Sequence, residues 1–365
     1  MQKIQYNNIL ISVTAHMGDF IWATSAFACL KKTYPQIKIT IMAPKTIKDL
    51  IIDNPIIDDA VYCPYSDGDS KSRIKKFLWA FMIAPKLFLK KFDAAFIFDS
   101  SRAAIMAVKL ALMPKIVGAD LFFGGYDIAD PAAKYYTDKI ELVKNQDDAH
   151  VSTRYQTIIK SFFGIYNNAM PIIPDSSKYA YKAIELIKND NSALKVAVCV
   201  RGNRTSLNRW DINNFKKVIE DLDNKFEDIS FYLIGTADAF EYSQTIVDKA
   251  NIYNVCGKTS ILELKEFLKK MNLLISSDTG VVHMAALAGI DIVSLHGYTS
   301  PCVTGAMSHK VKAFHRAPEC FPCAYRIEIE KIPCFTYPNP KCFQLIKPQE
   351  VSDAAIKILE RIKNE

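Results

Sequence analysis

The sequence lacks several features that would place it in a membrane, secreted or fibrous class. None of its apolar runs reaches the roughly 18 residues that mark a membrane-spanning helix. It has no internal repeat or low-complexity tract, and its polar start, Met1–Asn8, has no apolar signal-peptide core. It also lacks the long basic tail typical of proteins that bind nucleic acid. We therefore expect a cytoplasmic globular protein with no nucleic-acid partner.

The composition is sufficient for two hydrophobic cores. Of the 365 residues, 50% are hydrophobic and 23% are charged, which is the balance of a globular chain. A chain of this length is expected to form two domains of roughly 170 residues. The formal net charge of +7 is modest for such a surface and suggests an anionic partner.

Apolar strands alternate with helical segments through both halves of the chain. Such alternation predicts parallel sheets covered on both faces. A proline-punctuated segment, Met170–Ser177, separates the two halves. We therefore predict an α/β fold of two Rossmann-like, doubly wound domains facing a cleft, over residues 1–174 and 175–347. Residues 121–145 carry few periodic signals, Ile290–Leu295 is the last predicted strand, and a final helix, 348–365, is expected to pack back on the first domain.

The stretch Leu273–Gly289 carries the clearest signal of a site. It opens with an apolar run typical of a buried parallel strand, continues through a polar turn, and ends in a helix with Gly289 as its C-cap. Asp278 or Thr279 is a natural N-cap, so backbone N–H groups should point outward at the carboxyl edge of a sheet, where phosphate binds. His283 lies one turn inside the helix. On spacing alone, a histidine there is more often structural than functional.

Six segments in order resemble glycosyltransferase family 9, the ADP-heptose:lipopolysaccharide heptosyltransferases. They are MGDFIWATSAFACLKKTYP, NPIIDDAVY, His150 at the head of a helix, GNRTSLNRWDINNF, GKTSILEL and SDTGVVHMAALAG, followed by CFPC and KPQEV. The resemblance implies the GT-B fold, with an acceptor-binding first domain and a second domain that binds the nucleotide sugar. It further implies an inverting transfer of a heptose or related sugar from an ADP-sugar to a lipopolysaccharide core or lipid-linked acceptor.

Asp19 is the candidate catalytic base of such a reaction. It follows Gly18, also expected to contact substrate, in the first strand–helix turn. A carboxylate there can take the proton of an acceptor hydroxyl, and the resemblance implies the same role. The alternative is that Asp19 only caps its helix. The resemblance adds His283 to the catalytic candidates, while Asp99 and Ser100 are expected either to face the acceptor or to cap the next helix.

The donor is expected at the sheet edge of the second domain. Helix N–H groups and planar guanidinium groups both suit a diphosphate. The candidate donor-binding residues are Arg201, Asn203, Arg204, Thr205, Asn208, Arg209, Gly235, Thr236, Glu241, Thr259, Asp278, Thr279 and Gly280. The alternatives are solvated loop arginines and first-turn acids. The family usually has a lysine where this chain has Asn208, so either Arg204 or Arg209 replaces it or phosphate binding is weaker.

Four of the nine cysteines form a C-x2-C-x10-C-x7-C pattern within a Cys-rich segment, 320–342. They are Cys320, Cys323, Cys334 and Cys342. The pattern predicts a structural zinc or iron site, and the alternatives are buried thiols or adventitious disulfides. Four protein ligands would leave no open position for catalysis, so such a metal would be structural. No cofactor is expected to be required for catalysis if the donor-site groups neutralise the diphosphate. Another four, Cys29, Cys63, Cys199 and Cys256, fall within predicted elements and are expected in the core.

The sequence leaves open two alternative functions and the role of one basic, apolar stretch. The family includes an iron-binding branch that acts on autotransporter proteins, so a protein O-heptosyltransferase is one alternative. A non-catalytic nucleotide-sugar-binding module is the other, supported only by Asn208. The stretch Lys71–Lys91 interleaves basic and large apolar residues. It predicts either a crossover helix that covers the sheet or peripheral contact with the inner face of a membrane.

Overall fold

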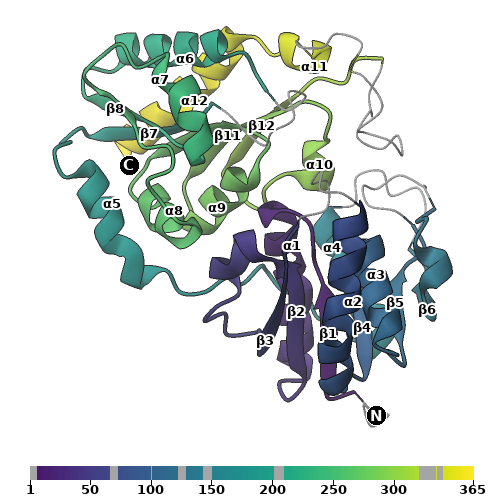
Figure 1. Cartoon of the computed structure of the whole chain (residues 1–365). Helices are drawn as coiled ribbons and strands as arrows, with labels where there is room; N and C mark the ends of the chain where they lie inside the picture. The colour runs from purple at the N-terminus through teal and green to yellow at the C-terminus, as the bar shows by residue number, and fades with distance from the viewer. Residues whose placement is uncertain are drawn as a thin grey trace. The chain divides into compact units, whose positions relative to one another are not determined.

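The computed structural model describes residues 6–65, 73–99, 101–121, 129–142, 150–200, 209–319, 334 and 340–365. The chain forms two compact units, Met1–Asp175 and Ser176–Glu365. Each unit contains one six-stranded sheet (Figure 1). The boundary between the units lies one residue from the boundary expected from the sequence.

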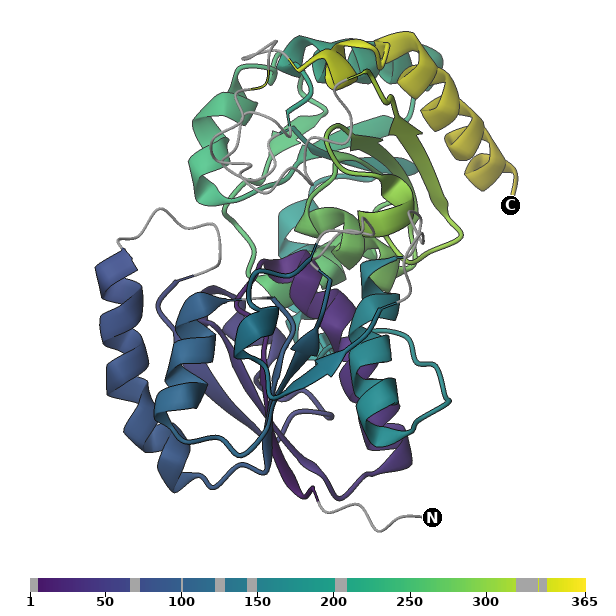
Figure 2. The same cartoon turned by 90° about the vertical axis from the view of Figure 1, so that its right-hand side faces the viewer.

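The first unit is a doubly wound parallel sheet. Its main elements are β1 (Asn8–Ser12), α1 (Met17–Thr33), β2 (Lys38–Pro44), β3 (Asp59–Cys63), α2 (Arg73–Leu89), β4 (Ala94–Ile97), α3 (Arg102–Leu110), β5 (Ile116–Ala119), β6 (Asp138–Ile140) and α4 (Val151–Phe163). The strands pair in the order β3-β2-β1-β4-β5-β6, which is the order of dinucleotide-binding folds. Helix α1 packs against α4, and α2 packs against α3 on the other face of the sheet (Figure 2).

The second unit repeats this plan. After α5 (Ala180–Ile187) come β7 (Leu194–Cys199), α6 (Ile212–Lys225), β8 (Ile229–Leu233), α7 (Phe240–Gln244), β9 (Ile252–Asn254), α8 (Ile261–Leu268), β10 (Leu273–Ser277), α9 (Gly280–Ala288), β11 (Asp291–His296), α10 (Pro301–Thr304), β12 (Val311–His315), α11 (Lys341–Gln344) and α12 (Pro348–Asn364). The strands pair in the order β12-β11-β10-β7-β8-β9. Read from β9 to β12, this is the strand order of the first sheet. The predicted α/β fold of two doubly wound domains is confirmed.

The two sheets form because their central strands are buried on both faces. In β1, Ile9, Leu10 and Ile11 are all 0% exposed, and the core of the second unit is built in the same way from β7 and β10. Strands covered on both faces show continuous apolar runs in the sequence, which is why these strands were predictable. The four cysteines predicted to lie in elements are buried, as expected.

Several elements depart from the sequence pattern. The segment that joins β2 to β3 contains a 3-10 helix, Lys45–Leu50, and not a regular α-helix. The sequence did not predict β6 or β12. Both are edge strands with partly exposed side chains, so neither carries the apolar run of a central strand.

The terminal helix α12 packs within its own unit, against α6, β10 and β11 (Figure 2). Its Val351, Ala355 and Leu359 belong to the core of the second unit. The guanidinium of Arg361 lies 2.6 Å from the carboxylate of Asp291 at the start of β11. The expectation that this helix also packs on the first unit stays a prediction.

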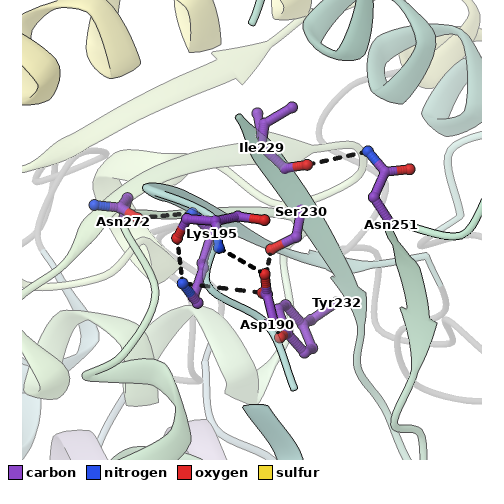
Figure 3. A network of polar contacts seen from close by, with 8 residues as sticks. Asp190, Lys195, Ile229, Ser230, Tyr232, Asn251 and Asn272 are labelled. Carbon is purple, nitrogen blue, oxygen red and sulfur yellow. Dashed lines mark hydrogen bonds and ion pairs between the residues drawn. The ribbon is translucent and has the colours of Figure 1, made fainter. Parts of the chain in front are cut away.

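Asp190 connects the segment before β7 to β8 (Figure 3). Its Oδ2 atom accepts hydrogen bonds from the Ser230 hydroxyl at 2.5 Å and the Tyr232 hydroxyl at 2.6 Å. Burial opposes ionisation, but these donors and Ser192 outweigh it and lower the pKa of Asp190 to about 2. A hydrogen bond to a charged group contributes about 1.5–3 kcal/mol. This buried carboxylate therefore has a structural role at the end of the sheet opposite its carboxyl edge.

Candidate functional site

In each unit, the candidate aspartates lie where the strand order reverses. The reversal falls between β1 and β4 in the first sheet and between β7 and β10 in the second. Loops that leave two such neighbouring strands run toward opposite faces of the sheet, so open α/β sheets bind ligands at this point of their carboxyl edge. Asp19 and Asp99 follow β1 and β4, and Asp278 follows β10.

Asp19 lies in the first turn of α1 and is half-buried, next to the buried Gly18. Its Oδ2 atom accepts a hydrogen bond from the backbone N–H of His16 at 3.1 Å, so it does cap the helix. A carboxylate has about four acceptor positions on its two oxygens. The cap bond uses one of these positions, so capping by itself does not exclude the role of a base.

Asp99 connects the two sides of the strand reversal. One of its carboxylate oxygens accepts the N–H of Thr14, which follows β1, and the other accepts the N–H of Ser101 at 3.4 Å. Helix α3 is capped by the Ser101 hydroxyl, which accepts from Ala104, and not by Asp99. The alternative that the stretch 99–101 caps the next helix is therefore confirmed at Ser101, and the contact of Asp99 with the acceptor stays a prediction. Ser100 lies outside the described residues.

Tyr155 was not found from the sequence. It is fully buried on α4, and its ring stacks on Phe98 with centroids 4.8 Å apart. Burial raises the pKa of Tyr155, and the negative charges of Asp19 and Asp99 raise it further. Both carboxylates therefore raise the pKa of the same phenol, although they follow different strands. Nothing local in the sequence distinguishes this tyrosine from an ordinary apolar position of an amphipathic helix.

Helix α9 begins at the carboxyl edge of the second sheet. Thr279 is its N-cap in extended conformation, and Gly289 ends it in the left-handed conformation with φ of 80°. Both features agree with the sequence prediction. The Thr279 side chain makes no capping hydrogen bond, so it leaves the first N–H groups of the helix for another acceptor.

The carboxylate of Asp278 contacts the end of β11 and the segment after it. Its Oδ2 atom accepts hydrogen bonds from the hydroxyls of Thr299 at 2.7 Å and Thr304 at 3.1 Å. The same oxygen lies 3.5 Å from Nδ1 of His296, and the Asp278 side chain is only 9% exposed. Burial opposes ionisation, but His296, His283 and Thr299 outweigh it and lower the pKa of Asp278 to about 2.

His283 is 5% exposed within α9. Its imidazole is one of the groups that lower the pKa of Asp278. His296, Thr299 and Thr304 were not predicted to belong to the site. They reach Asp278 from β11 and the segment after it, because β10 and β11 are paired in register.

The loops after β8 and β9 are joined beside this edge. The N–H of Gly257 donates to the carbonyl oxygen of Gly235 at 2.9 Å. Gly257 has a φ of +73°, and a Cβ there would come within 2.7 Å of the Ala237 backbone, so only glycine fits. Thr236 and Glu241 are exposed in the first of these loops and its helix, and Thr259 is half-buried in the second.

The remaining donor candidates are only partly described. Arg209 is half-buried next to Trp210, which is fully buried. Five further donor candidates, which precede Arg209 in the sequence, lie outside the described residues: Arg201, Asn203, Arg204, Thr205 and Asn208.

The cysteine segment gives no support for a metal site in the described part of the chain. Cys342 is buried in the core of the second unit, and Cys334 is partly exposed. Cys320 and Cys323 lie outside the described residues. Across the residues that are described, no three His, Cys, Asp or Glu side chains are grouped to hold a metal ion. The four-cysteine site stays a prediction.

Comparisons with known proteins agree with one another. The model of glycosyltransferase family 9 (heptosyltransferase) matches residues 105–332. Lipopolysaccharide heptosyltransferase 2 of Salmonella typhimurium is 22% identical over 320 residues, covering 83% of this chain and 86% of that protein.

Solved structures are similar over almost the whole chain. A family 9 glycosyltransferase of Veillonella parvula has a TM-score of 0.76 at 20% identity, covering 98% of each chain. The ADP-heptose lipopolysaccharide heptosyltransferase II of Escherichia coli has a TM-score of 0.73 at 17% identity, covering 98% of this chain and 99% of that one. The fold of these structures is the GT-B fold, which confirms that part of the prediction.

Proposed function

Because the chain belongs to glycosyltransferase family 9, the heptosyltransferases, we propose that it transfers a heptose or related sugar from an ADP-sugar to a lipopolysaccharide core or lipid-linked acceptor. The observation that carries this proposal is the pair of strand-reversal edges. One presents two carboxylates and the other presents the N-terminus of a helix. The similarity to a lipopolysaccharide heptosyltransferase 2 over 83% of the chain supports the substrate class.

In the proposed mechanism, Asp19 takes the proton of the acceptor hydroxyl as that oxygen attacks the anomeric carbon of the donor sugar. The bond between this carbon and the diphosphate breaks on the opposite side, so the configuration inverts. Asp99 holds the loop after β1 through the N–H of Thr14, which keeps the turn that carries Asp19 in place. A base positioned in this way contributes about 10²–10⁴-fold to the rate.

The second unit stabilises the leaving diphosphate. The N-terminus of α9 offers N–H groups and the positive end of the helix dipole, which favour an anion. Arg201, Arg204 and Arg209 supply guanidinium groups, and Thr279 and Gly280 bring the helix backbone to the phosphates. These groups neutralise the developing charge, so the proposal requires no metal ion in catalysis.

A donor screen followed by a transfer assay tests the proposal. We expect ADP to raise the melting temperature of the protein more than UDP, GDP or CMP at equal concentration, since binding to the native state stabilises it. Mixed with ADP-heptose and a heptose-deficient lipopolysaccharide core, the protein should release ADP and extend the core. A preference for another nucleotide contradicts the donor assignment. Binding of ADP-heptose without transfer to a lipid or autotransporter acceptor favours the non-catalytic module.

We further infer that α2 contacts an anionic membrane surface from the cytoplasmic side. The helix contains no acidic residue, and its Trp79, Ala80 and Leu87 cover the sheet. A second set of large apolar side chains on α2 and the end of α3 is nevertheless exposed. It consists of Ile74, Phe77, Leu78, Phe81, Met82, Phe88, Leu89, Leu110 and Leu112. Covering the sheet does not account for this second set, whereas exposed apolar side chains beside Lys75 and Lys86 suit an anionic lipid surface.

Vesicle binding tests this contact. None of the described helices has the length and apolar character to cross a bilayer, so we expect reversible association. Binding to vesicles that contain phosphatidylglycerol should fall about tenfold or more in K75Q/K86Q, because each lysine contributes about 1 kcal/mol at such a surface. F81D/L89D should lose binding as well. The matched control is I184D, a change at another exposed apolar residue, on α5. Equal binding by all variants contradicts the inference.

A further inference from the structure

A groove runs between the second half of α2 and the end of α3, two helices that pack against each other on one face of the first sheet (Figure 2). Its volume of about 500 Å³ lies within the range of about 300–1,000 Å³ that is usual for small-molecule sites. The side chains that line it are all apolar: Phe81, Ala84, Pro85, Phe88, Leu89, Leu110 and Leu112. These side chains offer no hydrogen-bond partner, so the groove suits an apolar occupant.

The α2 residues of the groove form a stripe separate from the one that covers the sheet. Their spacing along the sequence follows the helical period, so they lie on one side of α2. Ala80 and Leu87 belong to the core of the first unit, whereas Phe81 and Phe88 are exposed. Ala84 belongs to the core and also lines the groove. The exposed stripe is therefore additional to the packing that the fold requires.

Leu112 lines the groove from a position that rarely holds leucine. Its N–H donates to the carbonyl oxygen of Lys109 at 3.0 Å, and the N–H of Met113 donates to that of Val108 at 3.1 Å. This is the Schellman pattern of a helix end, in which glycine or asparagine usually takes the left-handed conformation. Leu112 takes it with a φ of 53° and is 74% exposed. Neither backbone preference nor packing within the fold accounts for a leucine here, whereas a ligand in the groove does.

The charges beside the groove favour an anion. Lys86 and Lys91 are exposed on α2 and directly after it, and α2 itself contains no acidic residue. Of the acids on the neighbouring strands and loops, Asp59 is paired with Lys90, and Asp93 accepts two backbone N–H groups from the chain entering β1. A second copy that presented the same face would bring lysines against lysines, which disfavours self-association.

The groove and the candidate base lie at opposite edges of the first sheet. Helix α2 leads into β4 and α3 leads into β5, so the ends of both helices lie where these strands begin. Asp19 and Asp99 follow β1 and β4 at the carboxyl edge. We therefore assign the groove to a lipid other than the acceptor.

We propose that this groove binds one acyl chain of an anionic membrane phospholipid, with Leu112 against the chain and Lys86 and Lys91 beside the headgroup. The inference rests on the proposed membrane contact of α2. It turns that contact from adsorption on a surface into a defined site for a single chain. It also gives a role to the end of α3, which adsorption through α2 alone does not need.

Single-chain amphiphiles below their critical micelle concentration test the groove without a membrane. We expect dodecyl phosphate to bind, measured by calorimetric titration. Across a series of alkyl phosphates, the affinity should rise about fourfold with each methylene group that enters the groove, and stop rising once the groove is filled. Dodecyltrimethylammonium has the same chain and a positive headgroup, so it should bind at least about tenfold more weakly. The absence of binding, or an affinity that keeps rising with chain length, overturns the inference.

Two variants change the groove in different ways. L110W fills it with a larger apolar side chain and should weaken the binding of dodecyl phosphate about tenfold or more, although it adds apolar surface. The matched control is I74W, the same kind of change at an exposed residue of α2 that does not line the groove. It should bind like the wild type, and an equal loss in I74W contradicts the inference.

L112N removes apolar lining but suits the left-handed conformation. Its melting temperature should therefore stay the same or rise, while the affinity for dodecyl phosphate falls about tenfold, the usual effect of losing a covered leucine side chain. A role of Leu112 in stability alone predicts the opposite result, with a lower melting temperature and unchanged binding. That result overturns the inference.

These outcomes separate the inference from the proposed function, because none of the measurements involves sugar transfer. If phosphatidylglycerol vesicles bind the wild type, L110W and L112N equally, the membrane contact holds and the acyl-chain site is wrong. If dodecyl phosphate binds but the vesicles do not, a membrane phospholipid is not the occupant and the inference fails together with the membrane contact. If the protein forms a dimer that L110W dissociates, the groove is an interface between two copies, which also overturns the inference.

Discussion

Replacing Asp19 by asparagine is expected to lower the rate of sugar transfer by about 10²–10⁴-fold, the usual contribution of a positioned general base. The amide of asparagine cannot take the proton of the attacking hydroxyl at neutral pH. Its carbonyl oxygen can still accept the N–H of His16, which is the hydrogen bond that Asp19 makes at the start of α1. We therefore expect an unchanged melting temperature together with a large loss of turnover, measured as ADP release with saturating donor and acceptor.

Glu350 provides a matched control for this experiment. It holds the same place in α12 that Asp19 holds in α1, and its carboxylate accepts the N–H of Lys347 at 3.2 Å. E350Q tests the effect of neutralising an acid at this helical position and should leave turnover unchanged. Turnover by D19N close to the wild-type rate would show that Asp19 is only a cap. In that case, D19A should cost about 0.5–2 kcal/mol of stability, the usual effect of losing such a cap, and leave turnover intact.

The fold was predictable because its central strands are buried on both faces. Strands such as β1 and β10 show as apolar runs, and the polar turns after them mark the carboxyl edge of each sheet. Asp19, Asp99 and Asp278 were found in this way, since each directly follows a strand or its turn. Family 9 membership was recognised from the order of the motifs, and the family model confirms it.

The partners of these residues were not predictable in the same way. His296 and Thr299 reach Asp278 only because β10 and β11 pair in register. Asp19 and Asp99 raise the pKa of Tyr155 only because α4 packs on α1. A local pattern records which face of an element is apolar, but it does not record which side chains meet across elements. For the same reason, the interleaved basic and apolar residues of α2 predicted a face that covers the sheet. They did not determine how many apolar side chains are exposed on the other face.

Trp210 directly follows Arg209, the one candidate arginine among the described residues. This tryptophan is 0% exposed, and its Nε1–H donates to the carbonyl oxygen of Ile346 at 3.1 Å. Its ring meets Phe215 of α6 edge-to-face, with centroids 5.0 Å apart. The indole therefore connects the chain just after Arg209 to the first turns of α6 and to the chain just before α12.

Replacing Trp210 by alanine is expected to lower the free energy of unfolding of the second unit by about 3–5 kcal/mol, the usual effect of removing a buried aromatic side chain. W210F keeps most of the packing but leaves the Ile346 carbonyl without its indole donor, which costs about 1–3 kcal/mol. Urea unfolding followed by circular dichroism measures both. Because natural domains are stable by only about 5–15 kcal/mol, W210A should be close to the limit of folding at 37 °C.

W210A should weaken donor binding by more than its loss of stability alone explains, because Trp210 directly follows Arg209, a candidate donor-binding residue. Below the melting temperature of each variant, we expect the affinity for ADP to fall in W210A and to be largely kept in W210F. Trp79 gives the comparison, since it is 7% exposed in the core of the first unit and contacts Tyr65 edge-to-face. W79A should destabilise its own unit and leave ADP binding unchanged. Equal losses of ADP affinity in W79A and W210A would mean that general destabilisation, and not the support of Arg209 by the neighbouring Trp210, governs how the protein holds its donor.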